Sequence, residues 1–328
     1  QCRRYLLMAT ILAAVTNYLH WSEQVHLINY YRLAPDNSPR LAKKVQQNMT
    51  MQFKASVLQY CAAASASETL PIIEELVAKS AAEGASFVCL PECATFLSLN
   101  RQALYDQAED EATSPSIARL SLLAKTHQVF LSVGSLLMRD AGADKCTNRG
   151  YLLNPQGEIS ARYDKIHMFD ATVGDGRTYR ESERFQRGYE PVLAQTAIGN
   201  IGLSICYDIR FPELYQGLSE AGADLLVIPS AFTAVTGAAH WHILQRARAI
   251  ETGCFVLSAA QYGTHADGRQ TYGHALIVAP WGEVLADAGS SDQGFVTADI
   301  DLAACSAAQK RHGTADNKQK LMPVRIIR

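Results

Sequence analysis

The sequence lacks the common metal-binding signatures and has no long basic segment. Neither a CxxC…CxxC pair nor an HExxH motif occurs, so zinc-ribbon and metalloprotease chemistry have no support. The chain holds 30 Lys and Arg residues against 32 Asp and Glu, which gives a net charge of −2. This balance gives no reason to expect a nucleic-acid partner. We therefore expect no bound metal, no cofactor and no nucleic acid.

The apolar run at the N-terminus is short. Tyr5–Val15 spans 11 residues, whereas a membrane-spanning helix needs about 20. Because two arginines precede it, the run resembles a signal or transit-type segment. No clean cleavage site follows, and a start at Met49 or Met51 would make residues 1–50 an extension or a start-site error. Both interpretations stay open, and neither predicts stable membrane insertion.

Dense cysteine clustering is also missing. The eight cysteines lie at positions 2, 61, 89, 93, 146, 206, 254 and 305, several of them inside apolar runs. A small secreted disulfide module groups its cysteines far more closely. We therefore expect mostly free thiols, a reducing compartment and a cytoplasmic protein.

From residue 52 onward, strands alternate with helices and hairpins. Strands are expected at 53–60, 85–92, 129–137, 224–230, 254–261 and 295–301. Helices are expected at 67–84 with Ser67 as N-cap, at 114–128, 212–222 and 238–252, and up to about 312. Hairpins are expected at 149–165, at 191–206 with a turn at Gly199–Asn200, and at 272–288. The mixture predicts mixed sheets with helices outside. We expect an N-terminal extension over 1–50, one domain over 51–315 and a C-terminal tail over 316–328.

Cys206 ends an apolar strand in the segment NIGLSICYDIRFPELYQ, residues 200–216. A cysteine at such a position usually packs in the core and is inert. Alternatively, it lies on a sharp strand-to-helix turn, where following backbone N–H groups could stabilise an oxyanion. The segment by itself favours the inert thiol. No papain-like surround such as CGSCW is present, so a Cys–His hydrolase is not supported.

Two further residues with possible chemistry also lie at strand ends. Glu92, in LPE, follows a buried strand, where an acid is costly unless it is paired or functional. Lys165, in RYDKIHMFD, ends a hairpin strand. Each alone has an ordinary explanation as a surface charge. Together with Cys206 they predict an active site, because layered sheet folds bind ligands at strand ends.

Four segments together resemble the nitrilase, or carbon–nitrogen hydrolase, superfamily. They are LPE, YDKIHMFD, YRESERFQRG and LSICYDIRFPELY, in the family's order, and the resemblance covers about 52–312. It is greatest to the branch of the deaminated glutathione amidases, the Nit half of Nit–Fhit fusion proteins. The resemblance implies an α/β fold of the four-layer α-β-β-α sandwich type. It also implies a homodimer or higher oligomer that pairs through the helix at 211–218.

The resemblance also implies the catalytic roles. The family's Glu-Lys-Cys set maps onto Glu92, Lys165 and Cys206, and a second glutamate maps onto Glu181. Glu92 would take the thiol proton, while Lys165 and the backbone N–H of Tyr207 would stabilise the oxyanion. Glu181 would hold Lys165 or the substrate amide. A lysine beside the sulfur is expected to favour the thiolate.

Supporting residues are expected around this set. Asp208 and Arg210 flank the cysteine turn, where we expect them to brace it. Ser230 and Phe232, in PSAFT, follow a strand and are expected to contact substrate. The loop FDATVGDGRTYRES is expected to shape the pocket, and so leaves the choice of substrate open.

The leading functional hypothesis is a thiol amidase. It would cleave a small carboxylate-bearing amide, most readily deaminated glutathione, through a cysteine thioester with release of ammonia. An ω-amidase acting on α-ketoglutaramate, or another aliphatic amide, nitrile or N-carbamoyl hydrolase, is the alternative. A non-catalytic interaction protein is disfavoured, because Glu92, Lys165 and Cys206 are all intact.

Overall fold

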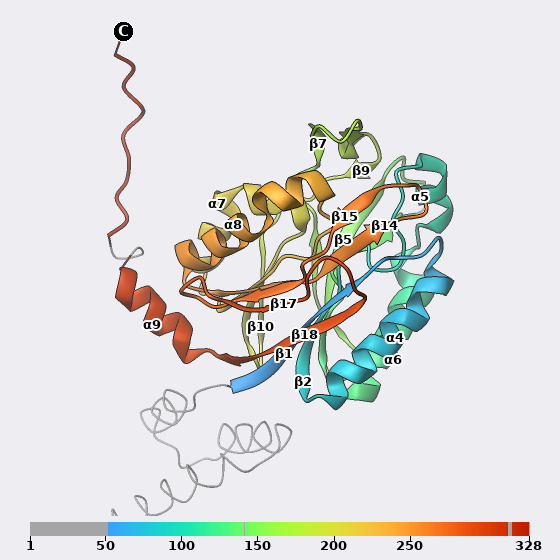
Figure 1. The fold of residues 1–328 in the computed structure, drawn as a ribbon, viewed down its shortest axis with the longest axis horizontal. Coiled ribbons are helices and arrows are strands. Elements are labelled where there is room, and N and C mark those ends of the chain that lie inside the picture. Colours follow the sequence, from blue (N-terminus) through green and yellow to red (C-terminus); the bar gives the residue numbers. More distant parts are fainter. Residues whose placement is uncertain (1–51, 141, 314–316, 328) are drawn as a thin grey trace, which may run out of the picture. The chain divides into compact units, whose positions relative to one another are not determined.

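The computed structural model describes residues 52–140, 142–313 and 317–327 (Figure 1). The expected N-terminal extension over 1–50 and the expected boundary at 315–316 therefore lie outside the described residues. Within them, no helix combines the length and apolar character that a membrane span requires. The seven cysteines described are free thiols.

The first sheet has ten strands, and β1 (Gln52–Tyr60) lies inside it. β1 pairs in parallel with β2 (Ala85–Cys89) and antiparallel with β18 (Gly294–Asp301), so the two ends of the domain meet in one sheet. The other strands are β3 (Phe130–Ser132), β4 (Leu136–Met138), β5 (Cys146–Leu153), β6 (Ile159–Asp164), β9 (Phe185–Gln186), β14 (Ala260–Thr264) and β15 (Gln270–Tyr272). A separate two-stranded ribbon is formed by β7 (Asp170–Thr172) and β8 (Thr178–Arg180).

The second sheet has six strands in the order β10-β11-β12-β13-β16-β17. They are β10 (Val192–Thr196), β11 (Gly199–Leu203), β12 (Leu225–Val227), β13 (Phe255–Ser258), β16 (Leu276–Val278) and β17 (Val284–Asp287). The central pairs β11–β12 and β12–β13 are parallel. Their residues are almost entirely buried, as parallel strands covered on both faces require.

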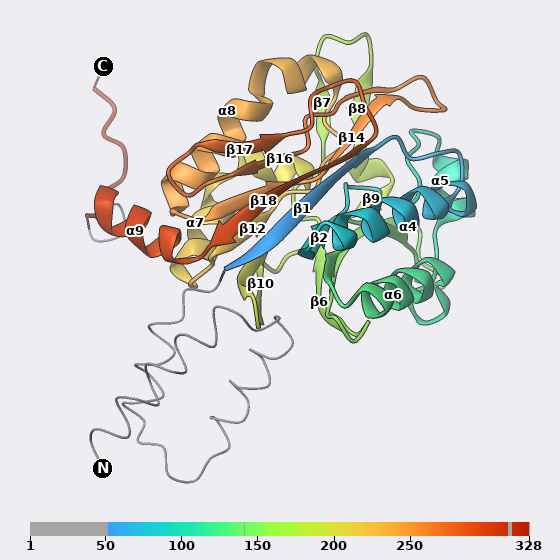
Figure 2. The same ribbon diagram turned by 60° about the horizontal axis from the view of Figure 1, so that its bottom comes forward.

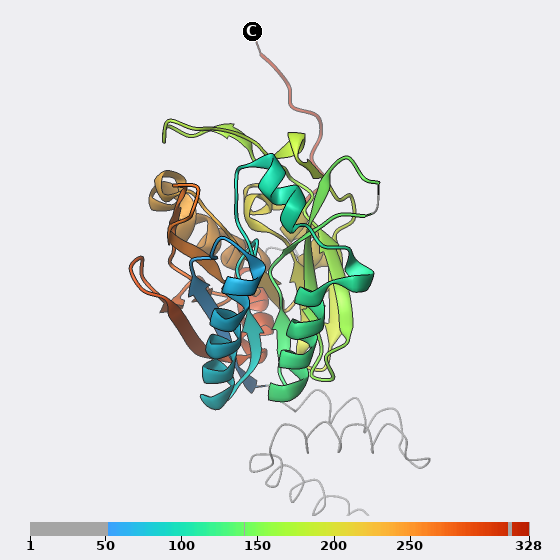
Figure 3. The ribbon, with the colours of Figure 1, turned by 90° about the vertical axis from the view of Figure 1, so that its right-hand side faces the viewer.

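Helices cover the outer faces of both sheets. α4 (Ala66–Ala82) and α6 (Pro115–His127) lie side by side over the first sheet (Figure 3). α7 (Pro212–Glu220) and α8 (Ala234–Thr252) cover the second sheet on the opposite flank (Figure 2). Two short helices, α5 (Arg101–Gln107) and α9 (Ala303–His312), lie outside this arrangement. The predicted α-β-β-α sandwich is therefore confirmed.

Four local expectations differ from the structure. The N-cap of α4 is Ser65, whose hydroxyl accepts from the Glu68 N–H, because the chain becomes helical one residue before Ser67. The second hairpin turns at 197–198, where Thr196 pairs with Gly199, because Ile198 buries its side chain completely.

The third difference concerns the expected strand at 254–261. It divides at Ala259, so that β13 joins the second sheet while β14 joins the first. The chain thus passes from one sheet to the other beside Ser230, whose N–H donates to the Ala259 carbonyl at 3.0 Å. The expected strand at 129–137 also divides, at residues 133–135, into β3 and β4.

Gly134, in the break between β3 and β4, holds the chain segment that carries Glu92. Its φ is +70°, and a Cβ at this position would lie 2.1 Å from the Pro91 carbonyl oxygen. We expect Gly134→Ala to lower the free energy of unfolding by about 3 kcal/mol or more, measured by urea denaturation. Gly217→Ala, on an exposed face of α7 with no atom near the new methyl, should change it by at most about 1 kcal/mol. Equal stability of the two variants would contradict this assignment.

Candidate active site

Cys206 lies on the strand-to-helix turn that the sequence predicts. It follows β11 and opens the 3-10 turn η3 (Cys206–Arg210), directly before α7. Its φ is +49°, a conformation that is uncommon for a residue other than glycine. The Cys206 N–H donates to the Pro229 carbonyl at 2.9 Å. The turn is therefore held by the end of the neighbouring strand β12.

Asp208 braces this turn from inside, as expected. Its carboxylate is completely buried and accepts from the Ile205 N–H at 2.9 Å and from the Tyr163 hydroxyl at 2.8 Å. His167 contributes both its backbone N–H at 2.9 Å and its ring Nδ1 at 2.7 Å. Arg210 differs from expectation, because it lines the cleft beside Cys206 and its Nη2 lies 3.3 Å from His240 Nδ1.

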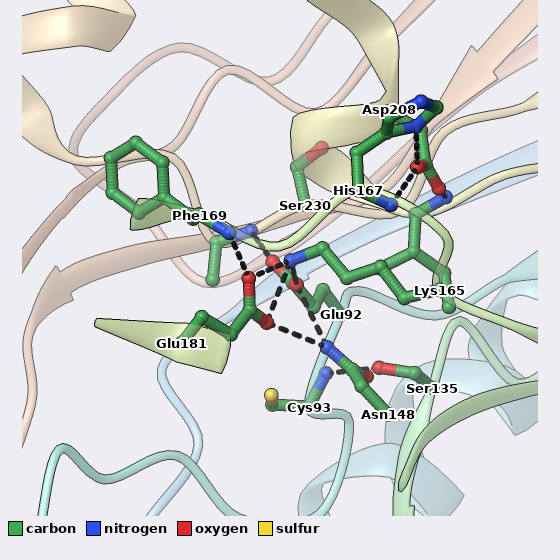
Figure 4. Close-up of polar contacts among 12 residues, drawn as sticks. Glu92, Cys93, Ser135, Asn148, Lys165, His167, Phe169, Glu181, Asp208 and Ser230 are labelled. Atoms are coloured by element: carbon green, nitrogen blue, oxygen red, sulfur yellow. Dashed lines mark hydrogen bonds and ion pairs between the residues drawn. The ribbon is translucent and has the colours of Figure 1, made fainter. Parts of the chain in front are cut away.

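Lys165 lies between the two predicted glutamates (Figure 4). Its Nζ is 2.8 Å from Glu92 Oε1 and 2.9 Å from both carboxylate oxygens of Glu181. Only 2% of the lysine side chain is exposed. Three segments distant in the sequence thus meet at one buried ammonium group: the end of β2, the end of β6, and the short helix η2 (Glu181–Glu183).

Additional donors hold the two carboxylates in place. Asn148 Nδ2, on β5, is 3.1 Å from Glu92 Oε1 and 3.5 Å from Glu181 Oε1. The Ala231 N–H donates to Glu92 Oε2 at 2.9 Å, and the Phe169 N–H donates to Glu181 Oε2 at 2.6 Å. Asn148 lies mid-strand, where the sequence gives no indication that it takes part in the site.

The charges of this cluster stabilise one another. Burial by itself would raise the pKa of Glu92, but the charge and hydrogen bond of Lys165 hold that pKa below its ordinary value. Burial would likewise lower the pKa of Lys165, and the charges of Glu181 and Glu92 instead raise it well above the ordinary value. Glu92 is therefore a carboxylate, and Lys165 an ammonium, across the physiological pH range.

The Cys206 sulfur is a thiol at rest, although Lys165 lowers the pKa of Cys206, as expected. Burial and the negative charge of Glu92 raise the pKa of Cys206 well above its ordinary value, and Lys165 only partly opposes them. Glu92 and the Cys206 thiol line the same cleft, and the charge of Glu92 is one of the causes of the raised pKa. A base and a protonated nucleophile thus line the same cleft.

The cleft above Cys206 includes some of the expected residues and excludes one. Tyr207 and Phe232 line it together with Glu92, Lys165, Glu181 and Cys206. Ser230 does not line it, because its fully buried hydroxyl donates to the Ile228 carbonyl at 3.1 Å. The expected contact between Ser230 and substrate thus has no support from its position.

Sequence reasoning missed two arginines of this cleft, Arg184 and Arg269. Both lie in polar loop segments, where an arginine is ordinarily a solvated surface residue. Only the fold brings them to the rim of the same cleft.

Comparison with known proteins places the chain in a family. The carbon–nitrogen hydrolase family model matches residues 54–310. The chain belongs to the carbon–nitrogen hydrolase family. A deaminated glutathione amidase from Synechocystis sp. is 44% identical over 252 residues, which cover 76% of this chain and 92% of that protein. An omega-amidase from Xenopus tropicalis is 37% identical over 251 residues, which cover 76% of this chain and 89% of that protein.

A solved structure supports the same assignment. The crystal structure of the Caenorhabditis elegans NitFhit protein matches with a TM-score of 0.77 at 35% identity, over 82% of this chain and 66% of that one. The predicted resemblance to the nitrilase superfamily and its Nit branch is thus confirmed. As a carbon–nitrogen hydrolase, this family member acts on C–N bonds other than peptide bonds.

One group of side chains outside the cleft has metal-ligating atoms. Among the described residues, His242, His274 and Asp287 bring such atoms within 4.8 Å of one another. Asp287 already accepts hydrogen bonds from the other two, at 2.8 Å from His242 Nε2 and 2.9 Å from His274 Nδ1. None of the three lines the cleft.

The lowered pKa of Glu92 gives a testable pH dependence of stability. In the unfolded chain a glutamate titrates near pH ~4.3, and the folded value lies below it. The stabilisation from charged Glu92 is therefore present above that pH and is lost as the pH falls through the folded value. We expect the free energy of unfolding, measured by urea denaturation, to be higher for wild type than for Glu92→Gln at pH 6. This advantage of wild type should be smaller at pH 3. A difference independent of pH would contradict this assignment.

Proposed function

We propose that this chain is an amidase that hydrolyses the amide bond of a small carboxylate-bearing substrate, with Cys206 as the nucleophile. The observation that carries the proposal is that Cys206, Glu92 and Lys165 line one cleft, in which Lys165 Nζ lies 2.8 Å from Glu92 Oε1. A nucleophile, a base and a cation thus share one buried cluster at the floor of a cleft.

The first half of the reaction forms a thioester. Glu92 takes the proton of Cys206 as the sulfur attacks the amide carbonyl carbon. The C–N bond of the tetrahedral intermediate then breaks, and Glu92 passes the proton to the leaving nitrogen, which departs as ammonia from a primary amide or as a free amine from a secondary amide. Because the pKa of the thiol is raised, proton transfer and attack are expected to occur together.

The developing oxyanion needs hydrogen-bond donors at the turn. A lysine ammonium has three N–H donors. Lys165 Nζ contacts one oxygen of Glu92 and both oxygens of Glu181, and we propose that the two Glu181 oxygens share one N–H, which leaves a third for the oxyanion. The backbone N–H of Tyr207, the residue after the nucleophile, is the second donor that we propose. Glu181 acts by fixing the position of Lys165.

The second half regenerates the enzyme. Glu92, again a carboxylate after the ammonia or amine has left, takes a proton from a water molecule that attacks the thioester carbonyl. The C–S bond breaks, the product leaves as a carboxylic acid, and the sulfur recovers its proton from Glu92. One residue thus serves as acid and base in turn.

The substrate that we propose first is deaminated glutathione. This rests on the relative of that name at 44% identity and on three arginines in the cleft, Arg184, Arg210 and Arg269, which suit an anionic substrate. The omega-amidase relative makes α-ketoglutaramate the second candidate. Deaminated glutathione is a secondary amide, so its hydrolysis is read by the free amine that it releases and not by the ammonia expected from the sequence, whereas α-ketoglutaramate is a primary amide and releases ammonia. A panel that adds aliphatic amides, nitriles and N-carbamoyl compounds separates the remaining alternatives, and only carbamoyl substrates also release carbon dioxide.

Removal of the nucleophile provides the direct test. We expect Cys206→Ala to abolish hydrolysis of deaminated glutathione, measured as release of the amine product, a loss of at least about 10³-fold, while circular dichroism and the melting temperature show a folded protein. Cys254→Ala removes another buried thiol, outside the cleft, and should keep most of the activity. Full turnover by Cys206→Ala would refute the mechanism.

We also propose that the protein is cytoplasmic and forms a homodimer or a higher homo-oligomer. The helix expected to pair, 211–218, is α7, which packs against α8. We propose that the interface extends onto the exposed face of α8, because Val235, Ile243 and Ile250 lie on it with 47%, 70% and 43% of their surfaces exposed. Cell fractionation tests the location.

Charge substitution tests the assembly. We expect Ile243→Lys to weaken self-association at least about tenfold in analytical ultracentrifugation, since a buried unpaired charge costs more than 1.4 kcal/mol. Leu122→Lys, on the exposed side of α6, should leave it unchanged. A monomeric wild type would contradict the proposed dimer.

A further inference from the structure

Two arginines approach the cleft from segments that the catalytic cluster does not use. Arg184 follows η2 directly, and Arg269 lies in the turn between β14 and β15. Both line the same cleft as Cys206. Each is anchored by one N–H: Arg184 Nη1 donates to the Leu99 carbonyl, and Arg269 Nη2 to the Ala231 carbonyl, both at 2.6 Å. Their guanidinium groups are therefore held in place.

Each guanidinium group leaves a buried donor unsatisfied. Within the described residues, Nε of Arg184 and Nε of Arg269 are both buried and have no hydrogen-bond partner. Buried side-chain donors are nearly always paired, because an unpaired one costs about 1–3 kcal/mol. Two such donors on neighbouring cleft residues indicate that a ligand supplies the missing acceptors.

The two arginines also bring like charges together. Burial lowers the pKa of Arg184, and the positive charge of Arg269 lowers it further, while Glu181 opposes both. Arg269 also lies over the ring of Tyr179, with Cζ 5.7 Å from the ring centroid. Two cations that repel each other in a partly desolvated site are stabilised when an anion binds to both.

We propose that Arg184 and Arg269 form a carboxylate subsite, which binds the carboxylate that the substrate carries away from its scissile amide. A guanidinium fork matches a carboxylate in geometry and charge. The position also fits, because Arg269 bonds to the carbonyl of Ala231, whose N–H bonds to Glu92. A substrate held there keeps its amide beside Cys206. The subsite deepens the proposed amidase function and rests on it.

A matched pair of substrates tests the subsite. Glutaramate is a primary amide with a remote carboxylate, and its methyl ester is the same molecule without the charge. We expect Arg184→Gln and Arg269→Gln each to lower kcat/KM for glutaramate about 10- to 100-fold, mainly through KM, as loss of a charged hydrogen bond predicts. The methyl ester should stay within about 3-fold of wild type.

Control variants separate binding from folding. Arg246→Gln removes an arginine of α8 that bonds to the Gly282 carbonyl outside the cleft, and it should leave both substrates unaffected. Arg269→Lys keeps the positive charge but loses the two-pronged guanidinium geometry, so its KM for glutaramate should lie between those of wild type and Arg269→Gln. Equal losses on both substrates, or no loss on either, would overturn the subsite.

A binding measurement distinguishes failure of the subsite from failure of the proposed function. Glutarate is titrated calorimetrically into Cys206→Ala, and we expect at least about tenfold weaker binding when Arg184→Gln or Arg269→Gln is added. If wild type hydrolyses no amide of the panel but this loss appears, the amidase proposal fails and the carboxylate subsite stands. If inorganic phosphate binds as tightly as glutarate, or the loss is absent, the carboxylate subsite is refuted.

Discussion

The Lys165 ammonium, buried between Glu92 and Glu181, is the interaction on which the site depends. A buried ion pair is costly unless every charge is paired and hydrogen-bonded, and removal of one partner leaves a far more costly uncompensated charge. Here the ammonium contacts both carboxylates within 2.9 Å, and Asn148 and two backbone N–H groups complete their shells. The ends of β2 and β6 and the helix η2 must therefore be placed accurately for the cluster to be stable.

Passage of the chain between the two sheets provides this accuracy. The strand that begins in the second sheet as β13 continues in the first as β14. Near this crossing, Gln261 Nε2 donates to the backbone carbonyl of Glu92 at 3.1 Å. On the other side, the buried carboxylate of Asp208 fixes the Cys206 turn to His167 and Tyr163. The nucleophile and its base thus come from different sheets, each held by buried hydrogen bonds.

In the resting site, the proton is bound to the Cys206 sulfur and not to the Glu92 carboxylate. A lysine near a cysteine favours a thiolate in isolation. Here the negative charge of Glu92 opposes the effect of Lys165 on the Cys206 sulfur, and the charge of Lys165 is largely neutralised by Glu92 and Glu181. Burial then decides the resting state in favour of the thiol. A neutral thiol beside a permanent carboxylate resists oxidation better than a thiolate, and becomes nucleophilic when a carbonyl is in place to be attacked.

The sequence by itself determined the elements and the strand-end positions of Glu92, Lys165 and Cys206, because short-range patterns and motif spacing carry that information. The family resemblance added Glu181. The sequence could not determine whether the resting Cys206 is a thiol or a thiolate, since that depends on burial and on charges from other segments. Nor could it place Ser230 away from the cleft, or Asn148, Arg184 and Arg269 toward it. Their neighbours are far away in the sequence, and only the tertiary structure decided which of these polar side chains meet at one site and which point elsewhere.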